Sequence, residues 1–414
     1  MDYRQAVDWL FGVIQFGMKL GLDNPRALLK HFGVPHNDLR IIHVAGTNGK
    51  GSTCAFAHSC LSQAGIRTGL FTSPHLIDFR ERIRVGDELI PEKDVARFLT
   101  QIRKHAESME VHPTFFEILF ALALLHFRDA GAEAAVIETG LGGRFDATNT
   151  ITPAVSAITS IGLDHQKWLG ETLAEIAGEK AGIIKPGIPA VSAPQQPEAQ
   201  KVLESRAVEV GTKLETVTPS SYPKAKALGL YGKHQQENAA VAVAAMTAAG
   251  FSFGNNDLAN GLRSTTWPAR FQRIQSSGGE VVIDGAHNAH AARALRKTWQ
   301  QVFPDQKATV IYSAADGKDA MQFLEEIAPV AERFIFTSSS SNRAVAPSDL
   351  GDLYKASFAS PDYPPYSLVG DPTGSLTEAQ KFPDSTLVTG SLFLAGDVLA
   401  LIDGEQQTDP SEKL

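Results

Sequence analysis

The stretch IIHVAGTNGKGSTCAF, residues 41–56, is the strongest indicator of the fold, because its pattern predicts a buried strand, a glycine-rich loop and a helix in succession. The apolar run 41–44 has the length and composition of a buried strand. Ser52 and Thr53 are residue types that favour helix starts, and the glycines before them allow a tight turn with exposed backbone N–H groups. A helix start of this kind, with Lys50 beside it, predicts a phosphate-binding site.

The spacing of this loop differs from the usual pattern G-x-x-x-x-G-K-S/T, in which the hydroxyl residue directly follows the lysine. Here Gly46 and Gly49 lie closer together, and Gly51 separates Lys50 from Ser52. Ser52 supplies a hydroxyl group suited to Mg²⁺. The alternative is a plain strand–helix turn without a ligand, which the lysine and the helix start together disfavour.

The composition indicates an ordinary globular protein. The chain has 414 residues, 43% of them hydrophobic, and its net charge of -8 gives no reason to expect nucleic acid as a partner. Charges of both signs near the N-terminus argue against a signal peptide, and the longest apolar runs fall short of the about 20 residues that span a bilayer. Two cysteines cannot supply a disulfide framework or a four-ligand zinc site. We expect a cytoplasmic monomer without membrane or nucleic-acid partners.

Short apolar runs alternate with helical patterns along most of the chain, which predicts a mainly parallel, doubly wound sheet. Candidate strands of this sheet are residues 41–44, 68–72, 134–138, 155–161 and 189–193. The pattern weakens over 194–233, where TPSSYPKAKALG is predicted to be loop. A second series of strands predicts a smaller α/β unit, at residues 281–284, 308–313, 333–337 and 386–389. A boundary near Pro268 gives domains of residues 1–268 and 269–414.

Ligands of open α/β sheets bind beyond the carboxyl ends of the strands, so polar residues at those ends are candidates for chemistry. Ser73, Glu138 and His165 each close or follow a predicted strand. A carboxylate opposite a phosphate loop suits Mg²⁺, and a neutral imidazole can ligate a metal ion. A structural role is the alternative, since a glutamate at a strand end is commonplace and a lone histidine is more often structural.

Three arginines, Arg80, Arg82 and Arg84, follow the second predicted strand at alternate positions. On a strand they would share one face and form a cationic rail for a carboxylate. A solvated edge strand explains the spacing equally well. Arg144 and Asp146 lie on the glycine-rich loop after the third predicted strand, where binding residues concentrate.

The second unit also has polar residues at its strand ends. Asp284 ends one strand with His287 just beyond it, and Ser391 follows another strand before a helix. Any one of the three could be a cap or a turn residue. Together with the strand ends of the first unit, they indicate a cleft between the two domains.

Lys180 is the polar member of an otherwise apolar helical stripe that contains Leu173, Ile176 and Ala177. A lysine in the last turn of a helix suits the helix dipole and can extend its ammonium group into solvent. On an apolar stripe, desolvation instead favours the neutral amine, which is the form that reacts with CO₂.

Nine segments, in order, resemble the folate branch of the Mur ligase family, which contains folylpolyglutamate synthase and dihydrofolate synthase. They are HVAGTNGKGST, FTSPHLIDFRERIRV, IETGLGGRFDATN, SIGLDHQKWLG, EKAGIIKPG, KHQQENAA, WPARFQ, DGAHN and VTGSL. The resemblance covers nearly the whole chain and explains the phosphate loop, because this branch inserts a glycine at the position of Gly51. It implies an α/β fold with an N-terminal ATPase domain on a mainly parallel sheet and a smaller Rossmann-like C-terminal domain.

The resemblance also implies the ligands and their residues. ATP would be bound by Thr47, Asn48, Gly49, Lys50, Gly51, Ser52, Thr53, Asn238, Arg270, Asp284 and His287. Two Mg²⁺ sites would involve Ser52, Ser73, Glu138 and His165. Substrate contacts would come from Arg82, Phe116, Arg144, Asp146 and Ser391. Lys50, Lys180, His165 and Arg270 would be the catalytic residues, and Lys180 matches a lysine that family members carry as a carbamate.

The implied activity is ATP-dependent ligation of L-glutamate to dihydropteroate and to reduced folates. A carboxylate of the pterin substrate would attack the γ-phosphate, and the glutamate amine would then attack the resulting acyl phosphate. The loop GGRFDATN is typical of members that also accept dihydropteroate. Asp146 could accept hydrogen bonds from pterin N–H groups, and Phe116 could provide an aromatic wall.

Three alternatives stand beside this interpretation: a folylpolyglutamate synthase without the second activity, a murein-type amino-acid ligase, and a regulatory protein that binds nucleotide without catalysis. Only about 45 residues precede the phosphate loop, too few for a further domain of typical size, which disfavours the murein type. Retention of Lys50 and Arg270 disfavours the regulatory protein. The chain departs from the family pattern at Ala289, where proline is common, and in the region 194–233, which looks short by a β-hairpin.

Overall fold

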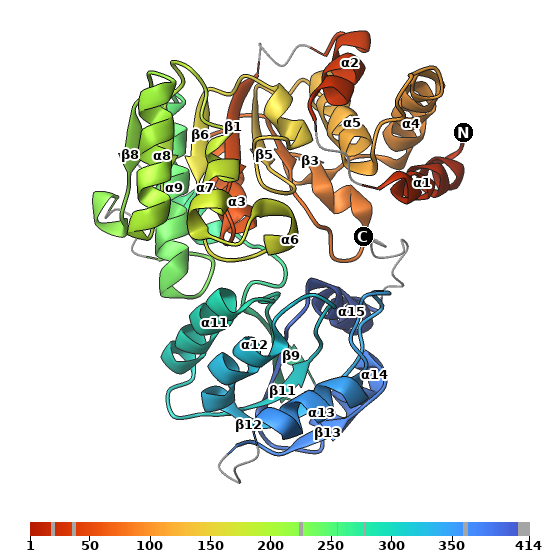
Figure 1. Ribbon diagram of the computed structural model, residues 1–414, viewed down its shortest axis with the longest axis vertical. Helices are drawn as coiled ribbons and strands as arrows, with labels where there is room; N and C mark the ends of the chain where they lie inside the picture. The colour runs from red at the N-terminus through yellow and green to blue at the C-terminus, as the bar shows by residue number, and fades with distance from the viewer. Residues whose placement is uncertain are drawn as a thin grey trace.

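The computed structural model describes residues 1–17, 21–34, 39–222, 227–254, 256–276, 279–358 and 363–404. They form two α/β bodies, one above the other in Figure 1, each built on its own sheet. The larger body, at the top, carries a sheet of eight strands, and the smaller body carries a sheet of six. Both sheets are mainly parallel, which confirms the predicted fold class.

The strands of the larger sheet follow one another in the order β4 (Glu88–Leu89), β3 (Ile83–Val85), β2 (Thr68–Phe71), β5 (Ala134–Glu138), β1 (Arg40–Ala45), β6 (Val155–Ile158), β7 (Ala190–Ser192) and β8 (Leu214–Thr216). Among the strands of this sheet that the structure describes, the pairs β2–β3 and β3–β4 are antiparallel and the others are parallel. The helices of this body are α1 (Tyr3–Gly12), α2 (Asp23–His31), α3 (Lys50–Gln63), α4 (Glu92–Ala106), α5 (Phe115–Asp129), α6 (Gln166–Leu169), α7 (Leu173–Ala181), α8 (Pro197–Glu209), α9 (Lys233–Ala248) and α10 (Asp257–Ser264).

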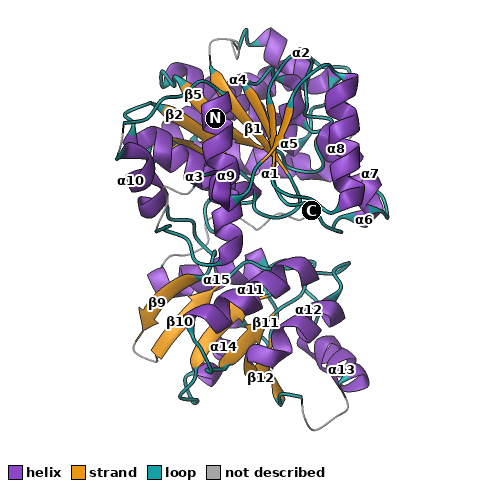
Figure 2. Ribbon diagram, turned by 90° about the vertical axis from the view of Figure 1, so that its left-hand side faces the viewer, coloured by secondary structure: helices purple, strands orange, loops and turns teal. Residues whose placement is uncertain are grey.

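Helices cover both faces of this sheet, and the alternation of side chains along each strand explains why. Ile41 of β1 packs into a core with α1, α4 and α5, whereas its neighbour Ile42 packs on the other face with α3, α9 and α10. Successive residues of a strand point to opposite faces, so a strand that is apolar throughout must be covered on both sides. Figure 2 shows the strands lying between these helical layers.

The smaller sheet has the order β13 (Tyr366–Leu368), β12 (Ala331–Phe336), β11 (Ala308–Tyr312), β14 (Ser385–Thr389), β10 (Gly279–Ile283) and β9 (Gln272–Ser276). Within its described residues, the pair β9–β10 is antiparallel and the other pairs are parallel. Its helices are α11 (Ala289–Val302), α12 (Ala320–Ile327), α13 (Pro347–Ser357), α14 (Pro372–Ala379) and α15 (Leu392–Asp403). One face packs on α11, α12 and α13, and the other on α14 and α15. The expected boundary near Pro268 falls between α10 and β9, where the chain passes from one body to the other.

Two expectations about local structure were wrong. Arg80 and Arg82 do not share a strand with Arg84, because a 3₁₀ turn (Phe79–Arg82) precedes β3. Asp78 caps that turn and Glu81 closes a capping box on it, so the local polar side chains outweigh the alternating charges. The weak region after residue 194 contains α8 and β8, which both end before the predicted loop 218–229. The described part of that loop holds a 3₁₀ turn (Pro219–Ser221), and residues 223–226 lie outside the described part of the chain.

The start of α3 also differs from the prediction. Gly49, with a left-handed φ of 91°, is the N-cap, and Ser52 and Thr53 lie in the first turn rather than at the cap. Across the described residues, no helix combines the length and the apolar character that crossing a membrane requires.

Candidate active site

The loop after β1 and the first turn of α3 form a cradle that only glycine permits. A Cβ atom at Gly49 would lie 2.2 Å from Oδ1 of Asn238, and a Cβ atom at Gly46 would lie 1.8 Å from Oγ1 of Thr159. Both glycines have φ values in the region that L-residues rarely adopt, 91° and 155°. The loop backbone therefore packs directly against the side chains of Asn238 and Thr159 at the N-terminus of a 14-residue helix, a position that fits a bound phosphate.

Some of the backbone N–H groups predicted to bind phosphate donate hydrogen bonds to acceptors within the protein. The N–H groups of Thr47 and Asn48 both donate to the carbonyl oxygen of Ser160, at 2.9 and 3.2 Å. The N–H group of Thr53 donates to Gly49 O at 2.9 Å. These three residues shape the loop, while the first-turn N–H groups of Lys50, Gly51 and Ser52 are those that a helix leaves without an intrahelical acceptor.

Gly51, the residue that interrupts the usual motif, lies under the linker between the two bodies. A Cβ atom there would come within 3.0 Å of the indole Nε1 of Trp267. The inserted glycine thus lets the linker pack directly on the first turn of α3. Trp267 was not predicted as a site residue, although it precedes the predicted boundary by one residue.

Two lysines lie on the floor of the cradle. Lys50 Nζ donates to Gly46 O at 3.2 Å and to Thr47 O at 3.3 Å, and Lys180 Nζ donates to Gly46 O at 2.9 Å. Lys180 is only 3% exposed, so its ammonium group does not extend into solvent. Burial, with the charge of Lys50 as a second cause, lowers the pKa of Lys180 to about 7. A large part of the Lys180 population is therefore a neutral amine near neutral pH.

Glu138 and Ser73 lie in a cavity next to the cradle, at the carboxyl ends of β5 and β2. The cavity is lined by residues of both bodies and of the linker: Gly51, Thr72, Ser73, Pro74, Leu76, Glu81, Arg84, Glu138, Trp267, Pro268, Arg270 and Leu392. The Ser73 N–H group donates to Oε2 of Glu138 at 3.2 Å. Burial raises the pKa of Glu138, and the positive charges of Lys50, Arg270 and Arg82 oppose this shift.

The donor set fits a divalent cation that is shared with a substrate. Glu138 supplies a buried carboxylate, and Ser52 and Ser73 supply hydroxyl groups on the elements beside it. Desolvation lowers the pKa of His165 to about 4, which leaves the imidazole in the neutral form that ligates metals. The described residues hold no group of three or more His, Cys, Asp or Glu side chains able to bind a metal ion by themselves. Phosphate oxygens and water would complete the ligand set.

Arg270 reaches the cavity from a strained turn that Asp284 holds in place. Ala269 and Phe271, on either side of Arg270, both have positive φ values, 54° and 47°. Asp284 accepts hydrogen bonds from Phe271 N at 2.8 Å and from Ala286 N at 2.9 Å. Burial raises the pKa of Asp284, against the charge of Arg270. In this structure Asp284 shapes the turn, and its predicted contact with nucleotide stays a prediction.

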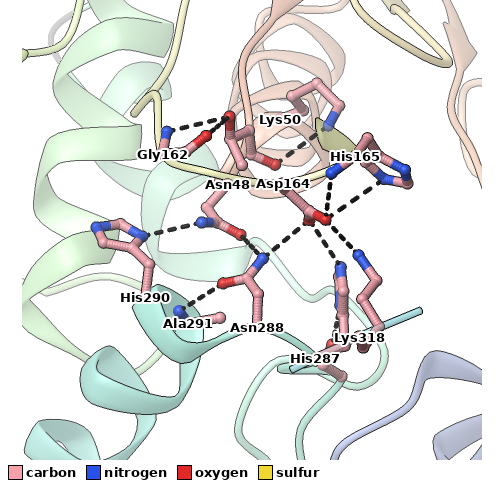
Figure 3. A network of polar contacts seen from close by, with 12 residues as sticks. Asn48, Lys50, Gly162, Asp164, His165, His287, Asn288, His290, Ala291 and Lys318 are labelled. Atoms are coloured by element: carbon pink, nitrogen blue, oxygen red, sulfur yellow. Dashed lines mark hydrogen bonds and ion pairs between the residues drawn. The ribbon is translucent and has the colours of Figure 1, made fainter. Parts of the chain in front are cut away.

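Figure 3 shows a polar network between the two bodies that is centred on Asp164. The Asp164 carboxylate of the larger body accepts from Lys318 Nζ and, at 3.1 Å, from Asn288 Nδ2 of the smaller body. His287 Nε2 lies 3.7 Å from the same carboxylate. Lys318 and Asn288 were not predicted as site residues. Lys318 follows β11 within six residues, so its place beyond a strand end was a usable signal.

The residues expected to contact the pterin and glutamate substrates are mostly held by internal partners. Arg82, 1% exposed, donates from Nε to His75 Nδ1 at 2.8 Å. Ser391 caps α15 and accepts from Phe393 N at 3.1 Å. Neither side chain lines an open surface in this structure.

The loop 140–150 is arranged around Asp146 and contacts α7. Asp146 accepts from the Thr148 N–H and hydroxyl groups and from Leu141 N, and Arg144 forms an ion pair with Glu179 at 3.2 Å. Phe116 lies against the start of this loop, since a Cβ atom at Gly140 would be 2.6 Å from its ring. The structure thus brings Phe116 and the loop of Asp146 together, as a pterin site would require.

Asn238, predicted to contact adenine, is buried on α9 beside the cradle. Its Nδ2 group donates to Gln235 Oε1 at 2.9 Å, and its carbonyl oxygen accepts from the Thr53 hydroxyl at 3.4 Å. The predicted nucleotide residues of the first body are therefore contiguous in space.

The fold and this site are those of a ligase family. The chain matches the Mur ligase middle domain over residues 44–193 and the glutamate ligase domain of Mur ligases over residues 269–391. It is 35% identical to a dihydrofolate synthase/folylpolyglutamate synthase of Bacillus subtilis, over 96% of this chain and 98% of the relative.

Solved structures of similar proteins support the same family assignment. The chain superposes on E. coli FolC in complex with DHPP and ADP with a TM-score of 0.85 and 27% identity, over 98% of each chain. The bifunctional folylpolyglutamate synthase/dihydrofolate synthase of Yersinia pestis, complexed with AMPPNP and a Mn ion, gives a TM-score of 0.85 and 26% identity over 97% of this chain and 98% of that chain. The chain belongs to the Mur ligase family, in its branch of dihydrofolate synthases and folylpolyglutamate synthases.

Proposed function

We propose that the protein is an ATP-dependent carboxylate–amine ligase that joins L-glutamate to dihydropteroate and to reduced folates. One observation carries the proposal: the phosphate cradle, the buried Glu138 and the linker residue Arg270 meet at one cavity between the two bodies. Family membership and the complex of the E. coli neighbour with DHPP and ADP support the pterin substrate. Residues 1–268 would bind ATP and the pterin acid, and residues 269–414 would close the site.

The chain holds ATP and a divalent cation with separate groups. First-turn N–H groups of α3 and Lys50 would hold the phosphates, and Ser52, Ser73, Glu138 and His165 would hold Mg²⁺ at up to two sites. When bound, ATP and Mg²⁺ supply the phosphoryl group that activates the substrate carboxylate as an acyl phosphate, and the charge that stabilises its transfer. The Mn complex of the Yersinia neighbour supports the use of a divalent metal.

The protein's own contribution is positioning and positive charge. The reaction concentrates negative charge where phosphate meets carboxylate, and Lys50, Arg270 and Arg82 all act on the buried Glu138 at that place. The second body closes over the cavity through Leu392 and the linker, which keeps water away from a reactive acyl group. The reaction requires no nucleophilic side chain, since the substrate carboxylate and the glutamate amine are the nucleophiles.

Lys180 acts, in this proposal, as a carbamate. Its burial and its lowered pKa supply the neutral amine that reacts with CO₂, and the product is an anion. An anion there would remove the repulsion between two ammonium groups that share one carbonyl oxygen. It could then hold Lys50 or a metal-bound water at the edge of the cradle.

Release of ADP tests the proposed function directly. We expect ADP release with ATP, Mg²⁺ and L-glutamate together with either dihydropteroate or a reduced folate, and negligible release when the pterin acid or glutamate is omitted. Activity with reduced folates alone would restrict the protein to folylpolyglutamate synthase. ADP release that ignores glutamate, or no release with any pterin acid, would contradict the proposal and favour a nucleotide-binding protein without ligase activity.

A further inference from the structure

The side chain of Asn48, in the phosphate loop of the larger body, is held at both ends by the smaller body. Asn48 Oδ1 accepts from Asn288 Nδ2 at 3.2 Å, and Asn48 Nδ2 donates to Nδ1 of His290 at 2.9 Å. Figure 3 shows the three side chains in a row, with Asn288 and His290 projecting from the N-terminal end of α11. Asn48 lies only two residues before Lys50, so this contact reaches the phosphate loop itself.

The orientation of each group in this row follows from its neighbour. Asn288 caps α11, and its Oδ1 atom accepts from Ala291 N at 2.9 Å, so its Nδ2 group must face Asn48 and Asp164. The opposite amide orientation of Asn48 would place two Nδ2 donors against each other. With Nδ2 of Asn48 as the donor, Nδ1 of His290 must carry no proton.

The surroundings of His290 agree with a neutral ring. Burial lowers the pKa of His290, and the charges of Arg293 and Lys297 lower it further. His290 also lies near Gly162, since a Cβ atom built there would be 3.9 Å from its Cγ atom, and the Gly162 carbonyl oxygen accepts from the Thr47 hydroxyl of the phosphate loop at 3.1 Å. His290 is thus placed to accept one hydrogen bond at Nδ1 while remaining uncharged.

The backbone of Asn48 is fixed by the larger body, since its N–H group donates to Ser160 O at 3.2 Å. Only its side chain depends on the smaller body. If the two bodies separate, both polar ends of this amide lose their protein partners at once, and the loop loses a restraint two residues from Lys50. Docking of the second body and the conformation of the phosphate loop are therefore linked.

We propose that His290 is a positioning residue which, together with Asn288, clasps the side chain of Asn48 and so couples docking of the second body to nucleotide binding by the phosphate loop. The proposal rests on the proposed function in one respect, that a nucleotide is the ligand of this loop. By linkage, a nucleotide that binds the docked state more tightly must also favour docking. His290 touches neither the nucleotide nor the reacting atoms in this scheme.

The experiment uses three substitutions of His290 in the full chain, with AMPPNP and Mg²⁺ as the probe. His290→Asn keeps an acceptor where Nδ1 stands, His290→Gln moves it toward the position of Nε2, and His290→Ala removes it. Loss of one neutral hydrogen bond should weaken AMPPNP binding about three- to tenfold in the Ala and Gln variants, while the Asn variant stays near wild type. Gln300→Ala, an exposed change on the same helix, is the matched control.

A double-mutant cycle separates the effect of the hydrogen bond between Asn48 and His290 from a general loss of stability. In the Asn48→Ala background, His290→Ala should cause no further loss of affinity, because the partner of Nδ1 is gone. The proposal is overturned if His290→Ala binds AMPPNP as tightly as the wild type does, or if His290→Gln restores affinity as well as His290→Asn. It is also overturned if His290→Ala causes the same loss of affinity in the Asn48→Ala background as in the wild type. A wild-type chain that bound no AMPPNP would instead overturn the proposed function, which keeps the two failures apart.

Discussion

Lys50 and Lys180 both donate from Nζ to the carbonyl oxygen of Gly46, at 3.2 and 2.9 Å. Lys50 belongs to the phosphate loop and is partly exposed, whereas Lys180 comes from α7, is 3% exposed and has its pKa lowered to about 7. Two like charges on one acceptor repel each other, and burial makes the charge on Lys180 the costlier of the two. The pair therefore favours a neutral or modified Lys180, which leads to two measurable consequences.

The first consequence is a dependence of stability on pH. The folded chain releases the Lys180 proton near pH 7, while the unfolded chain keeps it to about 10.5, so the unfolded state binds more protons in between. The free energy of unfolding should therefore rise with pH across this window, by about 1.4 kcal/mol per pH unit. The measurement is urea unfolding of the wild type and of Lys180→Met in CO₂-free buffer at pH 7.5 to 9. The difference in unfolding free energy between the two chains, followed against pH, gives the slope that Lys180 contributes. A difference that does not change with pH would show that Lys180 is not titrating in this window.

The second consequence concerns CO₂ and activity. If Lys180 acts as a carbamate, ADP release should fall in CO₂-depleted buffer and return when bicarbonate is added. Lys180→Ala should be strongly impaired and partly rescued by acetate, a small carboxylate that can enter the vacated volume. The exposed Lys201→Ala variant serves as the control and should respond to neither. Indifference of the wild type to bicarbonate would leave Lys180 as an unmodified buried lysine.

Lys50→Ala should abolish ATP-dependent ligation and leave the fold intact. Lys50 lies at a helix start, and its Nζ contacts are to two loop carbonyls rather than to the core, so the lost contribution is charge at the phosphates. The measurements are ADP release, expected to fall by at least 100-fold, and the melting temperature, expected to change by no more than about 2 °C. Near-normal turnover at an unchanged melting temperature would remove Lys50 from the mechanism.

Gly49→Ala should damage nucleotide binding beyond what backbone strain alone explains. Gly65 is a matched control, because both glycines have positive φ values, 91° and 76°, but a Cβ atom at Gly65 meets nothing within 4 Å. Strain at positive φ should cost each variant about 1 kcal/mol of unfolding free energy. Only Gly49→Ala must also displace Asn238, so AMPPNP affinity should fall at least tenfold in this variant and stay unchanged in Gly65→Ala. Equal affinities in the two variants would mean that the cradle tolerates a side chain.

Asp146→Ala should impair the use of dihydropteroate more than the glutamylation of reduced folates, as the family loop predicts. The structure sharpens this test, because Asp146 also accepts hydrogen bonds from Leu141 N and from the Thr148 N–H group, both at 3.0 Å. Asp146→Asn keeps one acceptor for these loop bonds and is the informative companion variant. The ratio of kcat/KM for the two substrates decides the matter, since equal loss on both would assign Asp146 a role in loop structure alone.

Local sequence patterns were sufficient to predict the strand–loop–helix units and the family. Eight of the nine strands expected from alternation match a strand of the structure within two residues at each end, and the ninth, 155–161, is shorter as Val155–Ile158. The phosphate loop was predictable for the same reason, because glycine, lysine and a helix start act over a few neighbouring residues. Strands β3, β4, β8, β9 and β13 were missed, since they have only two to five residues and lack a regular apolar pattern.

The positions at which polar side chains of distant segments meet depend on how the helices and strands pack. From the sequence, Lys180 was well suited to extend into solvent at the end of its helix, but the packing of α7 places its Nζ under the phosphate loop, 134 residues away in the chain. Asn48 and His290 are separated by 242 residues, and nothing in either local pattern indicates that they share a hydrogen bond. Apolar periodicity is a property of one helix or strand, whereas such a hydrogen bond depends on how two finished bodies dock, and that docking is specified by contacts summed over both surfaces.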